Sequence, residues 1–163
     1  MNNAITVIFF IFLSLLFIVL QSTLLAPIKI GSFSPDFNLI LIIIIAMLSD
    51  VKGGSIYALG NGYLMDVLSG GLFGVNILSR LSIYAAIRGT THNVYYHQIP
   101  VLLAVIFLST IFSWLFIWVV IKINSDIDFI VSLSVILKQG AINTIVGVPL
   151  YLLIKNIHER IQK

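Results

Sequence analysis

Long apolar runs separated by short polar turns make up almost the whole chain of 163 residues. Six of these runs approach the length of a bilayer crossing, which needs about 20 apolar residues in a helix. The expected spans cover, in chain order, about 4–25, 35–48, 54–68, 72–87, 100–121 and 138–154. The pattern therefore predicts an all-α polytopic membrane protein, a compact bundle of six transmembrane helices in a single domain over residues 1–163.

The first and the sixth span are less sharply bounded than the others. The run from Ala4 to Leu25 has no basic leading segment and exceeds a signal-peptide core in length, which indicates an uncleaved first helix. The sixth span can begin at Phe129, with Lys138 inside it, or at Lys138 itself. We favour the start at Lys138, because its ammonium group then lies near the lipid headgroups. Residues 127–137 become an interfacial segment in that reading.

Composition supports the membrane class and removes several others. Hydrophobic residues make up 60% of the chain and charged residues 9%, more apolar surface than a soluble domain of this size can bury. The net charge of +3 comes from scattered residues, so the sequence gives little support to nucleic-acid binding. The chain has no cysteine, which excludes disulfides, thiolate metal sites and a cysteine nucleophile.

Basic residues in the loops predict the orientation, since loops rich in lysine and arginine stay in the cytoplasm. With six spans, one side of the membrane carries Lys52, Arg88, Lys155, Arg160 and Lys163. The other side carries Lys29 and Lys122. We therefore expect both termini in the cytoplasm.

The second span has a clear start signal in Ser34-Pro35-Asp36. Ser34 can cap the helix, Pro35 suits its first turn, and Asp36 favours the positive end of the helix dipole. We expect Pro35 and Asp36 to act in turn formation and packing.

One face of the third span carries small residues and ends in a carboxylate. Gly54, Ala58, Gly62 and Asp66 follow one another at intervals of four, which stacks them on the same side of a helix. An ionisable group among apolar residues is a functional-site hypothesis by default. We interpret these four residues as a partner-binding face. The alternative is that the glycines pack helices within the protein and Asp66 lies at the wet interface.

Arg80 is a second ionisable group within an apolar run. Asp66 and Arg80 lie on either side of the 69–73 turn and differ in depth by about 6 Å, which an arginine side chain can bridge. The spacing predicts an intramembrane polar pair between Asp66 and Arg80, with Asn61 and Asn76 as other possible partners of the guanidinium.

Catalytic and metal-binding chemistry has weak support. His92 and His97 are five residues apart and do not share a helical face, and Asp126 and Asp128 lack the rest of a calcium loop. No nucleophile, base and orienting group recur together. We expect no enzyme activity, no metal and no cofactor.

Glycines also mark the turn after the third span. Gly70, Gly71 and Gly74 are best explained by a turn with close helix packing, because the lysine of a phosphate-binding loop is missing. We assign the same turn and packing role to Asn76.

Residues 34–89 resemble the MreD family of rod-shape-determining membrane proteins. The residues that carry the resemblance are Pro35, Asp36, Gly54, Gly62, Asp66, Leu68, Ser69, Gly70, Gly71, Gly74 and Asn76, in that order. Length, six spans and a short basic tail agree over the rest of the chain. Arg80 departs from the apolar filling usual at this point in the family.

The resemblance implies a non-catalytic scaffold in the bacterial inner membrane, within the cell-elongation complex. Such proteins bind the single-span protein MreC. With MreC they help to couple MreB filaments to the peptidoglycan synthases of the lateral wall and so to cell shape.

A second reading comes from the fold, which in this family is similar to the substrate-binding subunit of energy-coupling-factor transporters. In that reading the chain is the substrate-binding membrane subunit of a vitamin-type transporter. Asp66, Arg80, Asn61 and Asn76, with Tyr63 as a possible contributor, would line a pocket near the outer face.

Overall fold

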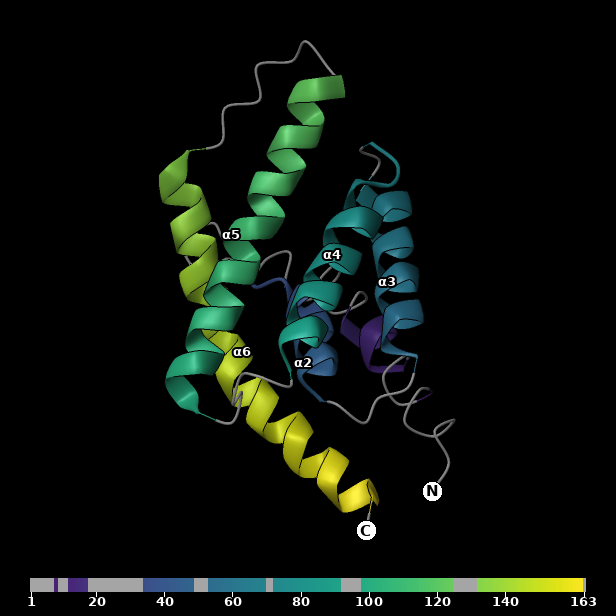
Figure 1. Cartoon of the computed structure of the whole chain (residues 1–163), viewed down its shortest axis with the longest axis vertical. Helices are drawn as coiled ribbons and strands as arrows, with labels where there is room; N and C mark the ends of the chain where they lie inside the picture. Colours follow the sequence, from purple (N-terminus) through teal and green to yellow (C-terminus); the bar gives the residue numbers. More distant parts are fainter. Residues whose placement is uncertain are drawn as a thin grey trace.

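The chain folds into a bundle of α-helices in a computed structural model, and the part of the chain that it describes contains no β-strand. The described residues are 8, 12–17, 34–48, 53–69, 72–91, 98–124 and 132–162. The helices are α2 (Phe37–Met47), α3 (Gly54–Ser69), α4 (Val75–Thr90), α5 (Ile99–Asn124) and α6 (Leu133–Gln162), and residues 12–17 are also helical (Figure 1). The all-α class predicted from the sequence is confirmed.

Each of these five helices overlaps one expected span. α5 and α6 have 26 and 30 residues, about 39 and 45 Å, so they exceed the roughly 30 Å of a bilayer core. They are also the two described helices that are both long and apolar enough to cross a membrane. α3 and α4 have 16 residues each, or about 24 Å. Most of the first expected span lies outside the described residues.

The start of the sixth helix differs from the expectation. α6 begins at Leu133, so residues 133–137 belong to the same helix as Lys138 and are not a separate interfacial segment. Lys138 lies exposed on the surface of α6. The ammonium group of Lys138 is therefore outside the protein interior although Lys138 lies within the helix. The helix can thus begin before Lys138.

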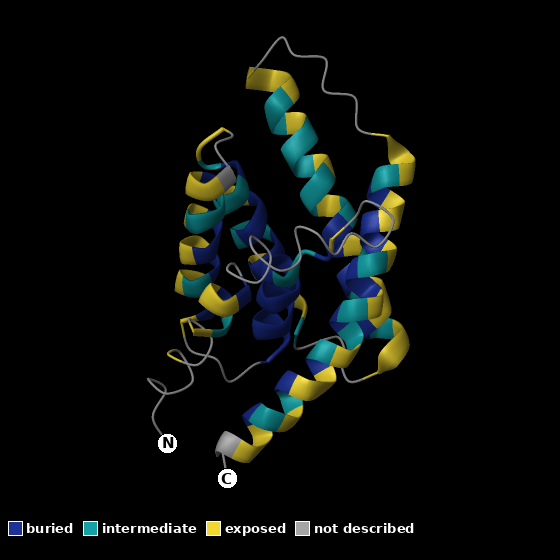
Figure 2. Ribbon diagram, turned by 180° about the vertical axis from the view of Figure 1, so that it is seen from behind, coloured by how far each residue is buried: buried dark blue, intermediate teal, exposed yellow. Residues whose placement is uncertain are grey.

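α2 forms the centre of the bundle. Residues 38–47 are all buried, and the six consecutive residues Ile40–Ile45 are at most 1% exposed. A helix that is apolar on every side must be covered on every side. α2 contacts α3, α4, α5 and α6, and it appears as a buried core in Figure 2.

The small-residue face of α3 packs against α4 inside the molecule. A Cβ atom at Gly62 would lie 2.5 Å from the Ile77 Cα, and a Cβ at Gly54 would lie 2.5 Å from the Tyr84 hydroxyl oxygen. Ala58 between them is fully buried. The absence of side chains thus lets two helices of the same chain approach closely.

The interpretation of Gly54, Ala58, Gly62 and Asp66 as a partner-binding face is therefore wrong. All four are buried, and α4 already occupies the surface that they form. The physical reason is connectivity, because only five residues separate the end of α3 at Ser69 from the start of α4 at Val75, and α4 packs on the face where α3 has its smallest side chains.

The glycines of α3 provide a matched test of this packing. Gly62→Leu should destabilise the protein by at least about 1–3 kcal/mol, because the new side chain must displace the α4 backbone at Ile77. Gly60→Leu places the same side chain on the same helix where a Cβ meets nothing within 4 Å, and it should be neutral or stabilising. Thermal unfolding of both variants in detergent measures the difference, and equal stability would contradict the packing.

Candidate functional site

Asp66 caps the start of α4 from the neighbouring helix. Its Oδ2 accepts hydrogen bonds from the backbone N–H of Gly74 at 2.9 Å and of Ile77 at 3.2 Å. Its Oδ1 accepts from the backbone N–H and from the Nδ2 of Asn76, both at 2.9 Å. The first N–H groups of a helix lack partners within the helix, and a negative charge there is favoured by the helix dipole.

The helix start itself explains why the cap comes from α3. The N-cap residue of α4 is Gly74, which has a φ of 94° and makes no side-chain cap hydrogen bond. A left-handed backbone is accessible to glycine without strain, but glycine has no side chain to bond the free N–H groups. Asp66 supplies that side chain, although only 3% of its surface is exposed.

Arg80 pairs with a different carboxylate from the one predicted. Its Nη2 lies 3.3 Å from the Oδ2 of Asp36, whereas the expected partner was Asp66. The carboxylate of Asp66 instead accepts hydrogen bonds from the start of α4. The depth estimate compared only α3 and α4, and it missed that α2 begins inside the bundle beside α4.

Asp36 is the N-cap of α2 and joins that helix to two others. Its Oδ1 accepts from the backbone N–H of Leu39 at 2.9 Å, so Asp36 acts as the cap that the sequence assigned to Ser34. Its own backbone N–H donates to the Oδ1 of Asn143 in α6 at 2.8 Å. Together with the Arg80 ion pair, these bonds tie the start of α2 to α4 and α6.

Two further side chains complete what we call the polar centre, consisting of Asp36, Arg80, Thr110, Gln139 and Asn143. The Nε2 of Gln139 donates to the Ser34 carbonyl at 2.8 Å and to the Asn143 Oδ1 at 3.2 Å. The Nδ2 of Asn143 donates to the Thr110 Oγ1 in α5 at 3.1 Å. The polar centre thus joins α2, α4, α5 and α6 through buried and partly buried hydrogen bonds.

The sequence reasoning missed Thr110, Gln139 and Asn143. A signal was present, because Gln139 and Asn143 are four residues apart and therefore share one face of an otherwise apolar helix. Two carboxamides on the same face of such a helix indicate a polar partner inside the bundle.

A second buried polar cluster joins residues 12–17 to α2 and α3. The Nδ2 of Asn61 donates to the Ser14 Oγ at 2.9 Å and to the Asn38 Oδ1 at 3.0 Å. The Nδ2 of Asn38 also lies 3.9 Å from the Met65 sulfur. Asn61, a possible partner of Arg80 in the sequence reading, therefore bonds elsewhere.

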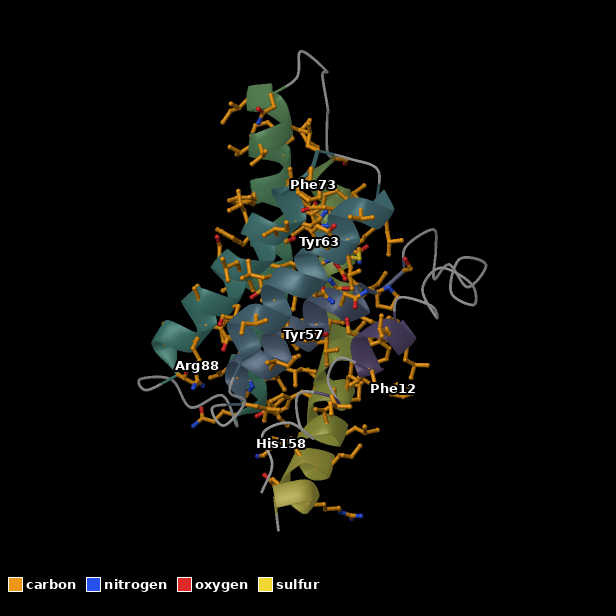
Figure 3. All side chains as sticks on the ribbon, turned by 90° about the vertical axis from the view of Figure 1, so that its right-hand side faces the viewer. Phe12, Tyr57, Tyr63, Phe73, Arg88 and His158 are labelled. Carbon is orange, nitrogen blue, oxygen red and sulfur yellow. The ribbon has the colours of Figure 1, made fainter. Side chains whose placement is uncertain are left out.

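A cavity of about 280 Å³ lies beside the polar centre. Its described lining is drawn from the start of α2 and from α3, α4, α5 and α6: Ser34, Pro35, Asp36, Leu39, Met65, Asn76, Thr110, Ser113, Trp114, Ile117, Gln139 and Asn143. Of the residues expected around a small-molecule pocket, Asn76 is in this lining. Tyr63 instead lies 52% exposed on α3, where its ring meets Phe73 edge-on (Figure 3).

Several other positions singled out in the sequence are not among the described residues. Gly70, Gly71, His92 and His97 lie outside the described residues. Among the described residues, no three His, Cys, Asp or Glu side chains gather in a way that could hold a metal ion.

Comparison with known proteins gives one match. The model of a family described as rod shape-determining protein MreD matches residues 1–158. No curated protein and no solved structure matches the chain.

Removing the Asp66 carboxylate should leave the first N–H groups of α4 without a buried acceptor. Asp66→Ala is expected to destabilise the protein by about 3 kcal/mol or more, because a buried donor without a partner costs about 1–3 kcal/mol. Glu159→Ala is the control, since its carboxylate is 58% exposed and pairs with Lys155 at the surface. Denaturant unfolding in detergent should separate the two, and similar midpoints would exclude the capping role.

The ion pair between Asp36 and Arg80 can be tested by a double-mutant cycle. Asp36→Asn keeps an acceptor for the Leu39 N–H but leaves Arg80 buried and uncompensated, so we expect a loss of about 2–3 kcal/mol. Adding Arg80→Leu should recover much of that loss, because the unpaired charge is then gone. Additive losses in the double variant would show that the two charges are not coupled.

Proposed function

The chain belongs to the MreD family of rod shape-determining proteins, and we propose that it is a non-catalytic scaffold of the cell-elongation complex that binds MreC. Family membership makes it a rod shape-determining membrane protein. The proposal adds that the chain couples MreB filaments, through MreC, to the synthases that build lateral peptidoglycan. The match over residues 1–158 is the observation that carries it, because it spans nearly the whole chain.

For the topology we propose six crossings of the inner membrane with both termini in the cytoplasm, in a fold of the energy-coupling-factor type. The ends of the bundle support this orientation. Arg88 and His158 lie at one end in Figure 3, and Phe73 and Tyr63 lie toward the other. Basic residues at one end and aromatic residues toward the opposite end agree with a cytoplasmic and an outer face, respectively.

Because α4 fills the small-residue face of α3, MreC needs a different surface. An apolar groove of about 610 Å³ lies between α5 and α6, and its lining is Leu103, Ala104, Phe107, Ala141, Thr144, Ile145, Val148 and Pro149. Ala104 and Ala141 are exposed and small, which allows another helix to approach closely. We propose that the transmembrane helix of MreC packs in this groove.

Pro149 gives the groove a polar feature that suits a helix better than a lipid chain. Pro149 lies within α6 and has no N–H, so it cannot bond the carbonyl of Ile145 one turn earlier. A serine or threonine hydroxyl on a neighbouring helix can donate to such a carbonyl in the membrane interior.

Replacement of the native protein in a rod-shaped host tests the scaffold role. Depletion should make the cells round, and expression of this chain should restore rods with MreC co-purifying. Failure of this chain to restore rods when it is expressed in the membrane of the depleted cells would contradict the role.

The groove has its own test, with alanines on two helices as a matched pair. Ala141→Phe fills the groove and should reduce MreC recovery at least about tenfold, a loss of about 1.4 kcal/mol. Ala85→Phe makes the same change at an exposed position on α4 and should leave recovery unchanged. Equal recovery from both variants would place the MreC contact elsewhere while leaving the scaffold role intact.

A further inference from the structure

The cavity beside the polar centre has hydrogen-bonding groups that the fold itself does not use. In the described part of the chain, the Asn76 Nδ2 donates to Asp66 and the Gln139 Nε2 donates to Ser34 and Asn143. All of these partners accept through oxygen, which fixes the amide groups with their nitrogens turned toward them. The side-chain oxygens of Asn76 and Gln139 accept no hydrogen bond from the described residues.

Asp36 adds a third acceptor to the same space. Each of its carboxylate oxygens accepts one hydrogen bond, from Leu39 or from Arg80, and an ionised carboxylate can accept about four. Its side chain is 29% exposed although its partner Arg80 is 4% exposed, so the carboxylate is the open side of the ion pair. Three side chains in the lining therefore have unused acceptor capacity, which suits a ligand with several hydrogen-bond donors.

Charge and shape narrow the class of ligand further. Arg80 already balances the charge of Asp36, so the cavity offers no net charge to a cationic or anionic ligand. Trp114 and Ile117 supply apolar surface in the same lining. The volume of about 280 Å³ is near the lower limit of about 300 Å³ for ligand pockets, which suits a single small ring.

We propose that this cavity binds a neutral, hydroxyl-rich ring of monosaccharide size, whose hydroxyl groups donate to Asp36, Asn76 and Gln139 while its apolar face rests on Trp114. Such a ring has many donors and no charge, and one of its faces is apolar enough to pack on an indole. It can be a free sugar or the sugar headgroup of a membrane lipid. The inference goes beyond the scaffold role and does not rest on it.

The test uses the full-length protein in lauryldimethylamine oxide, since this detergent has no sugar headgroup to compete. Glucose and N-acetylglucosamine, each at about 10 mM, are the free probes, and thermal unfolding is the readout because a ligand that binds the folded state raises the melting temperature. Choline and cyclohexanol are the controls, as a cation and as a ring with one hydroxyl group. For the lipid-linked source, the protein is placed in phosphatidylcholine nanodiscs with and without glucosyl-diacylglycerol.

Stabilisation by a free sugar supports a soluble ligand, and stabilisation by glucosyl-diacylglycerol alone supports a lipid headgroup. Stabilisation by neither, or by choline or cyclohexanol as strongly as by sugars, overturns the proposal.

Two tryptophans one turn apart on α5 locate the binding. Trp114→Ala should weaken sugar binding at least about tenfold, Trp114→Phe should retain most of it, and Trp118→Ala should leave it unchanged because Trp118 is outside the described lining. Should Trp114→Ala fail to fold, Ile117→Trp fills the same cavity and should abolish the shift. Equal binding by a folded cavity variant and the wild-type protein overturns the assignment of the site.

Discussion

The start of α2 imposes the constraint on which the rest of this bundle depends. A helix that begins inside an apolar bundle presents free N–H groups where water is scarce, and each unpaired group costs several kcal/mol in hydrocarbon. Asp36 caps the helix, and the Oδ1 of Asn143 accepts a hydrogen bond from the backbone N–H of Asp36 itself. Arg80 of α4, Thr110 of α5 and Gln139 of α6 in turn bond to Asp36 or Asn143, so hydrogen bonds at one helix end tie these three helices to α2.

The same principle operates a second time at the start of α4. Gly74 makes the turn possible but cannot cap the helix, so a carboxylate from α3 performs that task. The two carboxylates, Asp36 and Asp66, therefore both serve helix N-termini. A close approach of α3 and α4 through Gly62 is what brings Asp66 within reach of α4.

Helix class and approximate bounds could be predicted from the sequence because apolar runs and polar turns alternate so regularly. The small-residue face of α3 could also be predicted, because residues spaced four apart lie on the same side of any α-helix. The helix that packs on this face could not be predicted, because glycine spacing indicates a close neighbour without specifying which helix provides it.

The pairing of Arg80 was missed for a related reason. Depth along two helices can be estimated from residue counts, but the position of α2 beside α4 depends on tertiary packing. Gln139 and Asn143 were recoverable in principle from their shared face.

The shortness of α2 has a consequence for how the protein is made. Its 11 residues extend about 16 Å, roughly half of a bilayer core, and residues 38–47 are all buried in the finished fold. Such a segment is too short to cross a bilayer alone, and the partners of its N-cap Asp36 lie in α4 and α6, which are synthesised later. During biogenesis the nascent chain must therefore hold this segment in a provisional location until the later helices leave the ribosome and enclose it.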